Sequence, residues 1–138
     1  MRILPAVLAL SFSALAACSS TQSTIANEKT GYAISRTQAK EIVESSILAN
    51  FSPDYVNRGP ESSLTSSGYI RFALDTHTVN ATAIPMRGVL PDGKLSEGYG
   101  FEVISFGTMP ISGGSKAKSV YQLIKQQAQM AGSVLKTQ

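Results

Sequence analysis

Residues 68–84 read GYIRFALDTHTVNATAI, and the side-chain pattern of this stretch decides the predicted fold. Apolar and polar positions alternate along both halves, which is the pattern of half-buried β-strands. The two strands are predicted at residues 68–75 and 78–84. One face of the pair is apolar and carries Ile70, Phe72, Leu74, Val79, Ala81 and Ala83. The other face is mostly polar and carries Tyr69, Arg71, Asp75, Thr78, Asn80 and Thr82.

A third strand is predicted at residues 99–106, and Ile104 and Phe106 suggest that this strand is covered on both faces. Before it, Pro85 ends the second strand or forces an edge or a bulge, because proline donates no backbone hydrogen bond. Residues 86–90 can continue that strand. The sequence Pro91-Asp92-Gly93 predicts a turn, since proline presets φ and glycine accepts positive φ.

A helix is predicted on each side of the strands. Residues 37–50 place apolar side chains three and four positions apart, and Ser35 with Gln38 matches a capping box. Residues 116–131 show the same spacing after Ser115, and Leu135 continues the stripe. The order helix, three or four antiparallel strands, helix favours an α+β fold: a two-layer domain with both helices on one sheet face.

Composition divides the chain into three parts. Residues 1–17 read as a signal peptide, 18–30 as a polar, flexible tether, and 31–138 as a single small domain. Within the domain, residues 52–67 are rich in turn formers and predict a long loop that is either functional or mobile. Tyr55, Val56 and Leu64 are the side chains of this loop that could pack against the core.

The first part of the chain is too short to span a membrane. Met1-Arg2 gives a positive start, and residues 3–17 form a run of fifteen almost uncharged residues. A transmembrane helix needs about 20 apolar residues. A charged start, a short apolar run and a small-residue end are instead typical of a secretory signal.

The end of this signal, Leu15-Ala16-Ala17-Cys18, resembles the lipobox of bacterial lipoproteins, and Cys18 is the only cysteine. The resemblance implies that the Cys18 thiol carries diacylglycerol, that cleavage occurs before Cys18, and that the new amino group is acylated, for example with palmitate. Ser19 stands where aspartate would signal inner-membrane retention. In a diderm host the resemblance therefore implies sorting to the outer membrane, facing the periplasm.

The alternative for this segment is ordinary cleavage after Ala14-Leu15-Ala16, which leaves Cys18 as a free thiol. A lone thiol in an oxidising compartment invites unwanted intermolecular pairing, which disfavours that alternative.

Charge and chemistry narrow the functional classes. Without residues 1–17 the chain has 11 Lys and Arg against 9 Asp and Glu, too small an excess to indicate a nucleic-acid partner. His77 is the only histidine; with Asp75 it could in principle orient a serine, but a histidine in water at a strand end is favoured. One histidine and an anchored cysteine cannot complete a zinc site, so we expect neither metal nor cofactor.

One motif remains before the last helix. Gly113-Gly114-Ser115 could cradle an anion, although a hinge followed by a helix cap is the favoured interpretation.

The sequence therefore predicts a membrane-anchored envelope lipoprotein, not an enzyme, that acts by contact with another envelope protein. Immunity and inhibitor lipoproteins belong to this class. The alternative is a protein that binds a small ligand, a glycan or a lipid, in a cleft between the sheet and loop 52–67. A strand edge or the polar sheet face is the predicted partner surface. The residues of that face are Tyr69, Arg71, Thr78, Asn80 and Thr82.

Overall fold

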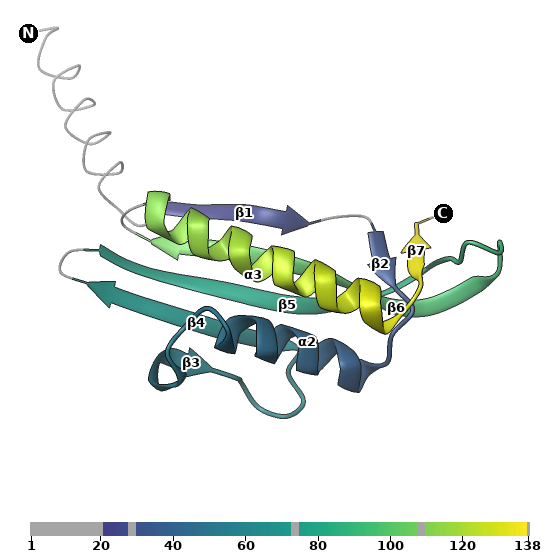
Figure 1. The fold of residues 1–138 in the computed structure, drawn as a ribbon, viewed down its shortest axis with the longest axis horizontal. Helices are drawn as coiled ribbons and strands as arrows, with labels where there is room; N and C mark the ends of the chain where they lie inside the picture. The colour runs from purple at the N-terminus through teal and green to yellow at the C-terminus, as the bar shows by residue number, and fades with distance from the viewer. Residues whose placement is uncertain (1–20, 28–29, 73–74, 108–109, 138) are drawn as a thin grey trace, which may run out of the picture.

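The computed structural model describes residues 21–27, 30–72, 75–107 and 110–137. Within these ranges the protein is mostly β, with seven strands in one sheet and two helices (Figure 1). The elements follow in the order β1 (Thr21–Asn27), β2 (Thr30–Tyr32), α2 (Arg36–Leu48), the 3-10 turn η1 (Pro53–Tyr55), β3 (Val56–Asn57), β4 (Thr65–Phe72), β5 (Asp75–Val89), β6 (Leu95–Gly107), α3 (Pro110–Ala131) and β7 (Val134–Lys136).

The spine of the sheet is the long hairpin of β5 and β6. The two strands pair in continuous register from His77 opposite Gly107 to Val89 opposite Leu95. With 15 residues, β5 extends for about 50 Å at the usual rise of a strand. The hairpin closes through the predicted turn, where Gly93 has a φ of 86° that a side chain would disfavour.

At its turn end the hairpin closes into a small antiparallel barrel of four strands. β6 pairs with β2 at Tyr99 and Tyr32, β2 pairs along its whole length with β7, and β7 returns to β5 through Lys136 and Val89. At the other end β4 and then β3 extend the sheet beyond β5, while β1 lies beyond β6.

The barrel is narrow enough that glycine is required where its strands meet. A Cβ atom on Gly31 would collide with the Met86 sulfur, and one on Gly88 would lie 2.7 Å from the Lys136 carbonyl oxygen. Cβ atoms on Gly88 and Gly98 would both point at Leu135, which is fully buried. Gly88 and Gly98 thus leave room for the Leu135 side chain, and Gly31 leaves room for Met86.

The predicted fold class, a two-layer α+β domain of helix, three- or four-stranded meander and helix with the helices on one sheet face, is wrong. Four strands, β1, β2, β3 and β7, were not predicted, and β2 and β7 close the barrel. β3 lies within residues 52–67, which were predicted to form a loop. β2 and β7 are only three residues long, too short to show a two-residue period. Residues 21–27, assigned to the flexible tether, form β1, so the folded domain begins before residue 31.

The helices and the strands enclose the core. The predicted capping box of α2 is confirmed: the Gln38 backbone donates to the Ser35 hydroxyl at 3.1 Å, and the Ser35 backbone donates to the Gln38 side chain at 3.0 Å. Buried side chains of α2 and α3 meet those of β5 and β6 in one cluster, whose centre includes Val43, Ile47, Val79, Val103, Val120 and Ile124.

The start of α3 differs from the prediction, whereas its end at Ala131 is confirmed. The helix begins at Pro110, so Gly113 and Gly114 lie in its first turns and not in a loop before it. Proline is favoured at a first helical position because its missing N–H would have no partner there. At the other end a Cβ atom on Gly132 would collide with the Ala33 carbonyl oxygen. The helix stops there, and Leu135 belongs to β7.

Pro85 lies inside β5 and not at its end, in a region where β5 is an edge on one side. β4 pairs with β5 only as far as Thr82, and β7 meets β5 only at Val89. The edge that the proline predicted is therefore present, and the strand continues through it because β6 pairs on the opposite side.

Candidate functional site

The residues that alternate with the core along β4, β5 and β6 form a second sheet face, which we call the open face. Its members are half-buried or exposed, whereas their neighbours on the same strands, such as Val79, Ala81 and Val103, are fully buried. The structure places all five predicted contact residues on this face. Its members are Thr65, Ser67, Tyr69, Arg71, Thr76, Thr78, Asn80, Thr82, Glu102, Ile104 and Phe106.

The strand register arranges the open face in rows that cross the sheet. One row consists of Tyr69, Thr78 and Phe106, and the next of Ser67, Asn80 and Ile104. A third row consists of Thr65, Thr82 and Glu102. Polar residues from β5 thus occupy the middle of each row, with an aromatic or aliphatic residue of β6 beside two of them.

Hydrogen bonds between side chains hold the polar part of this face in place. The Ser67 hydroxyl donates to Oδ1 of Asn80 at 2.7 Å, and the hydroxyls of Thr65 and Thr82 are 2.8 Å apart. Cross-strand pairs of this kind stabilise a sheet and restrict the rotamers of both partners. The open face therefore presents a preordered polar surface.

An exposed aromatic pair lies at one border of the open face. Tyr55, from η1, is 54% exposed and Tyr69 is 37% exposed, and their ring centroids are 6.3 Å apart. The sequence offered Tyr55 as a side chain that pins the loop to the core. Val56 and Leu64 do pack against the core, whereas Tyr55 packs against Tyr69. No periodicity marks Tyr55, because it lies in a turn.

Strand edges are the second predicted contact surface. β1 and β3 are the outermost strands of the described sheet. β3 has only two residues and pairs with β4 at Ser67 and Gly68. Within the described ranges no strand pairs with the outer edge of β4 from Tyr69 to Phe72. Unpaired edges of this kind are where a partner strand can add to a sheet.

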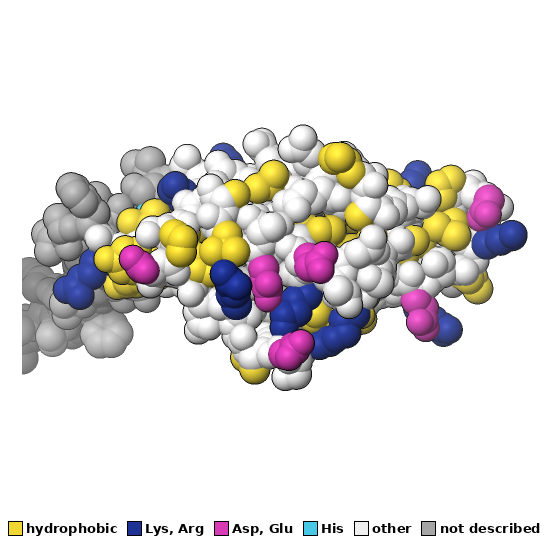
Figure 2. All heavy atoms as spheres, turned by 60° about the horizontal axis from the view of Figure 1, so that its bottom comes forward, with side chains coloured by type: hydrophobic (Ala, Val, Ile, Leu, Met, Phe, Trp, Pro, Cys, Tyr) yellow, Lys and Arg dark blue, Asp and Glu magenta, His cyan; other side chains and the backbone are white. Residues whose placement is uncertain are grey.

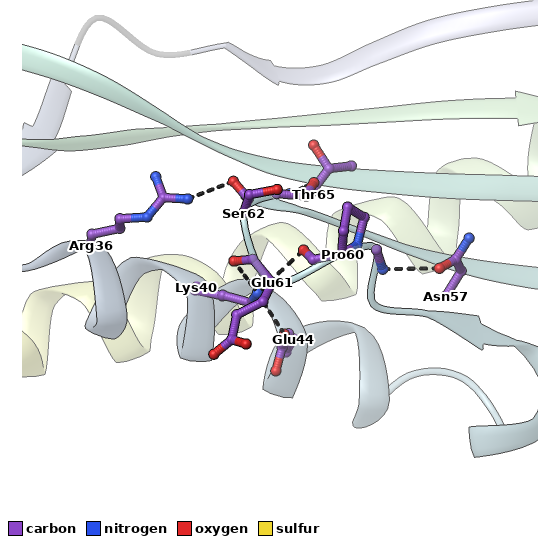
Figure 3. Close-up of polar contacts among 10 residues, drawn as sticks. Arg36, Lys40, Glu44, Asn57, Pro60, Glu61, Ser62 and Thr65 are labelled. Atoms are coloured by element: carbon purple, nitrogen blue, oxygen red, sulfur yellow. Dashed lines mark hydrogen bonds and ion pairs between the residues drawn. The ribbon is translucent and has the colours of Figure 1, made fainter.

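Loop 52–67 is tied down by two cations of α2, as Figure 3 shows. The Arg36 guanidinium donates to the Ser62 carbonyl at 2.5 Å, and the Lys40 ammonium donates to the Glu61 carbonyl at 2.6 Å. Lys40 also lies 4.0 Å from Glu44. Cations and anions stand side by side on the face that carries α2 and this loop (Figure 2).

Two clefts lie elsewhere on the surface, and no residue of loop 52–67 lines either of them. The first, of about 570 Å³, lies between the start of α2 and the β5–β6 hairpin. Its lining includes Arg36, Met86, Arg87, Glu97 and Tyr99. The second, of about 470 Å³, lies between α2 and α3 beside Met130.

His77 is not the water-exposed histidine that the sequence favoured. It is 2% exposed, because odd-numbered residues of β5 face the core in this region. In the parts of the chain that the structure describes, no three His, Cys, Asp or Glu side chains gather as a metal ion would require. No helix within the described ranges is both long and apolar enough to cross a bilayer. Cys18 lies outside the described residues.

The chain matches no model of a known protein family, and no curated protein has detectable sequence similarity to it.

Proposed function

We propose that this protein is a lipid-anchored lipoprotein of the bacterial envelope that acts without catalysis, by contact between its open face and another envelope protein. The anchor is the diacylglyceryl group that the lipobox at Leu15-Ala16-Ala17-Cys18 predicts on Cys18. Two or more acyl chains hold a protein at a bilayer stably, whereas a single chain holds it only marginally. Ser19 directs this anchor to the outer membrane in a diderm host.

The observation that carries the contact function is the preordered open face. Two pairs of side chains on it are already hydrogen-bonded, Ser67 with Asn80 and Thr65 with Thr82. Because their rotamers are restricted before binding, a partner pays less conformational entropy to bind them. Ile104 and Phe106 of β6, only partly buried, add apolar surface beside these pairs. A surface that combines apolar side chains with fixed polar groups has the composition of a protein interface.

A small-ligand function is the second candidate, supported by the cleft of about 570 Å³ at the start of α2. Ligand sites are commonly about 300–1,000 Å³ in volume. Arg36 and Arg87 line it beside the apolar Met86 and Tyr99, and Glu97 lies 3.5 Å from Arg87, so the lining offers charged groups of both signs to a glycan or a lipid headgroup.

Affinity capture with full-length protein from detergent-solubilised membranes tests the contact function. Asn80→Arg and Thr82→Arg place a long cation in the middle of the open face, and Gln126→Arg places the same cation on the exposed surface of α3. We expect the same envelope protein to be captured by the wild type and Gln126→Arg and to be lost with both face variants.

Two other results would decide against this function. Capture of an identical set of proteins by all four forms, each with unchanged circular dichroism, would contradict the open face as the contact surface. A co-purified small molecule that Arg87→Ala abolishes, in the absence of any face-dependent partner, would favour the ligand function.

A further inference from the structure

β1, the first described strand after the predicted anchor, begins at the same end of the sheet as one border of the open face (Figure 1). Across four strands, one row of the sheet contains Thr21 of β1, Gly107, His77 and Ile70 of β4. The start of β1 and the end of β4 are therefore level with each other, and Figure 1 shows both at the left. We call this the anchor end; the β5–β6 turn lies at the opposite end.

The chain between Cys18 and the sheet is short. Only Ser19 and Ser20 separate Cys18 from Thr21. Three residue steps span at most about 10 Å even when fully extended. If Cys18 carries acyl chains in a bilayer, Thr21 and its row of the sheet stand within about 10 Å of the headgroups.

An aromatic row lies next to the row of Thr21. It contains Tyr55, Tyr69 and Phe106, with Thr78 between the last two. Arg71 is on the same face, two positions along β4 toward the anchor end, and is exposed. The other large exposed apolar side chains of the described chain, Ile84, Leu95 and Met130, are isolated from this row.

We propose that the anchor end of the open face rests on the headgroups of an anionic bilayer through Tyr55, Tyr69 and Phe106, with Arg71 beside them. This inference rests on the proposed lipid anchor. Tyrosine is enriched at membrane–water interfaces because its ring is apolar and its hydroxyl is polar. Arginine places an apolar stem along such a surface and its charge among anionic phosphates.

Acidic residues at this end oppose the contact. Asp54 is exposed beside Tyr55, and Asp75 begins β5 opposite Phe72; carboxylates are repelled by anionic lipids. The contact therefore depends on the rings and on Arg71 together. The rows of Asn80 and Thr82, farther from the anchor end, stay above the headgroups and remain open to the protein partner.

The chain contains no tryptophan, so one introduced tryptophan is a clean fluorescent reporter. Full-length, lipidated Tyr55→Trp and, as the matched control, Leu95→Trp are reconstituted in nanodiscs that contain phosphatidylglycerol and brominated lipid. Leu95 is 68% exposed and lies at the far end of the hairpin. We expect about threefold stronger quenching with Tyr55→Trp than with Leu95→Trp, because an indole at the membrane interface comes close to the brominated lipid and an indole in water does not.

The contribution of Arg71 has its own readout. Arg71→Gln in the Tyr55→Trp background is expected to reduce quenching about twofold in anionic discs, and Arg71→Lys to retain it, because the attraction requires a cation. Discs of neutral phosphatidylcholine should show little difference between these variants. Tyr69→Trp is a second reporter that replaces Tyr55→Trp if the latter fails to fold.

The outcomes separate this inference from the proposed function. Equal quenching at both ends, in protein that is acylated and elutes with the discs, would overturn the bilayer contact and leave the anchor intact. Equal quenching together with loss of the captured partner in Tyr55→Trp would assign the aromatic row to the protein partner, which also overturns it. Protein that lacks acyl chains and elutes apart from the discs would remove the anchor itself.

Discussion

A Cβ atom on Gly98 would collide with the carbonyl oxygen of Tyr32, so β6 and β2 meet backbone to backbone where the barrel closes. The same Cβ would lie 2.6 Å from Leu135, which is fully buried. Neither the backbone of Tyr32 nor a fully buried leucine can move aside without opening the barrel. Closure therefore depends on the absence of a side chain at Gly98, as it does at Gly31 and Gly88.

Gly98→Ala is expected to lower the free energy of unfolding by about 3 kcal/mol, the upper part of the range for overpacked sites. Gly100→Ala is the matched control, because its Cβ would meet Met86 at 3.4 Å and the Thr30 carbonyl at 3.6 Å, ordinary van der Waals distances. We expect a change below about 1 kcal/mol for it. Urea unfolding followed by circular dichroism measures both, and equal effects would contradict the tight closure.

Gln127 connects the two helices through both ends of its amide. It donates to the Ser46 hydroxyl at 2.9 Å and accepts from the Ser45 hydroxyl at 2.8 Å. Ser46 is fully buried, so Gln127→Ala takes a partner from a buried hydroxyl and should cost about 2 kcal/mol of stability. Gln126→Ala, at an exposed neighbour, should cost less than about 0.5 kcal/mol. Chemical denaturation distinguishes the two, and the role of Gln127 is refuted if they are indistinguishable.

The hydrogen bonds from Arg36 and Lys40 of α2 to loop 52–67 should slow proteolysis of that loop. In the double variant Arg36→Met and Lys40→Met, the Ser62 and Glu61 carbonyls lose their charged donors. Local opening becomes easier without much effect on global stability. We expect trypsin to cut after the exposed Arg58 several-fold faster than in the wild type, as measured by mass spectrometry of timed digests. Lys94→Met, at the distant turn, should leave that rate unchanged.

Sequence patterns predicted the parts of the fold whose side chains show a clear period. α2 runs over 36–48 where residues 37–50 were expected, because its apolar spacing and its capping box are both local signals. The alternation in 68–84 likewise predicted β4 from Gly68 onward and the middle of β5, together with the face on which Tyr69, Arg71, Thr78, Asn80 and Thr82 lie.

The barrel was not predicted because its causes are not local. β2 and β7 have three residues each and pair with each other from opposite ends of the chain. The sequence carries one signal of the barrel, the glycines at 31, 88 and 98. Each of them lets a neighbouring strand or side chain approach closely, but which one approaches is known only from the fold. Polar β1 was assigned to a tether because its partner β6 lies some 80 residues away.

Only part of the candidate site was predicted, because only part of it follows a local sequence pattern. Strand alternation identified the polar residues of the open face, whereas Tyr55 reaches the face from a turn. The role of Gln127 has no local signal, since nothing in its neighbourhood in the sequence reveals that Ser46 is buried opposite it.

Intact mass spectrometry of the mature protein, purified from membranes of a bacterial host, tests the central claim most directly. The account predicts a chain that begins at Cys18 and carries a diacylglyceryl group with an acylated amino terminus. It also predicts that Cys18→Ser yields a protein that is unprocessed or released from the membrane fraction. A mature, secreted chain with an unmodified Cys18 thiol would contradict the account.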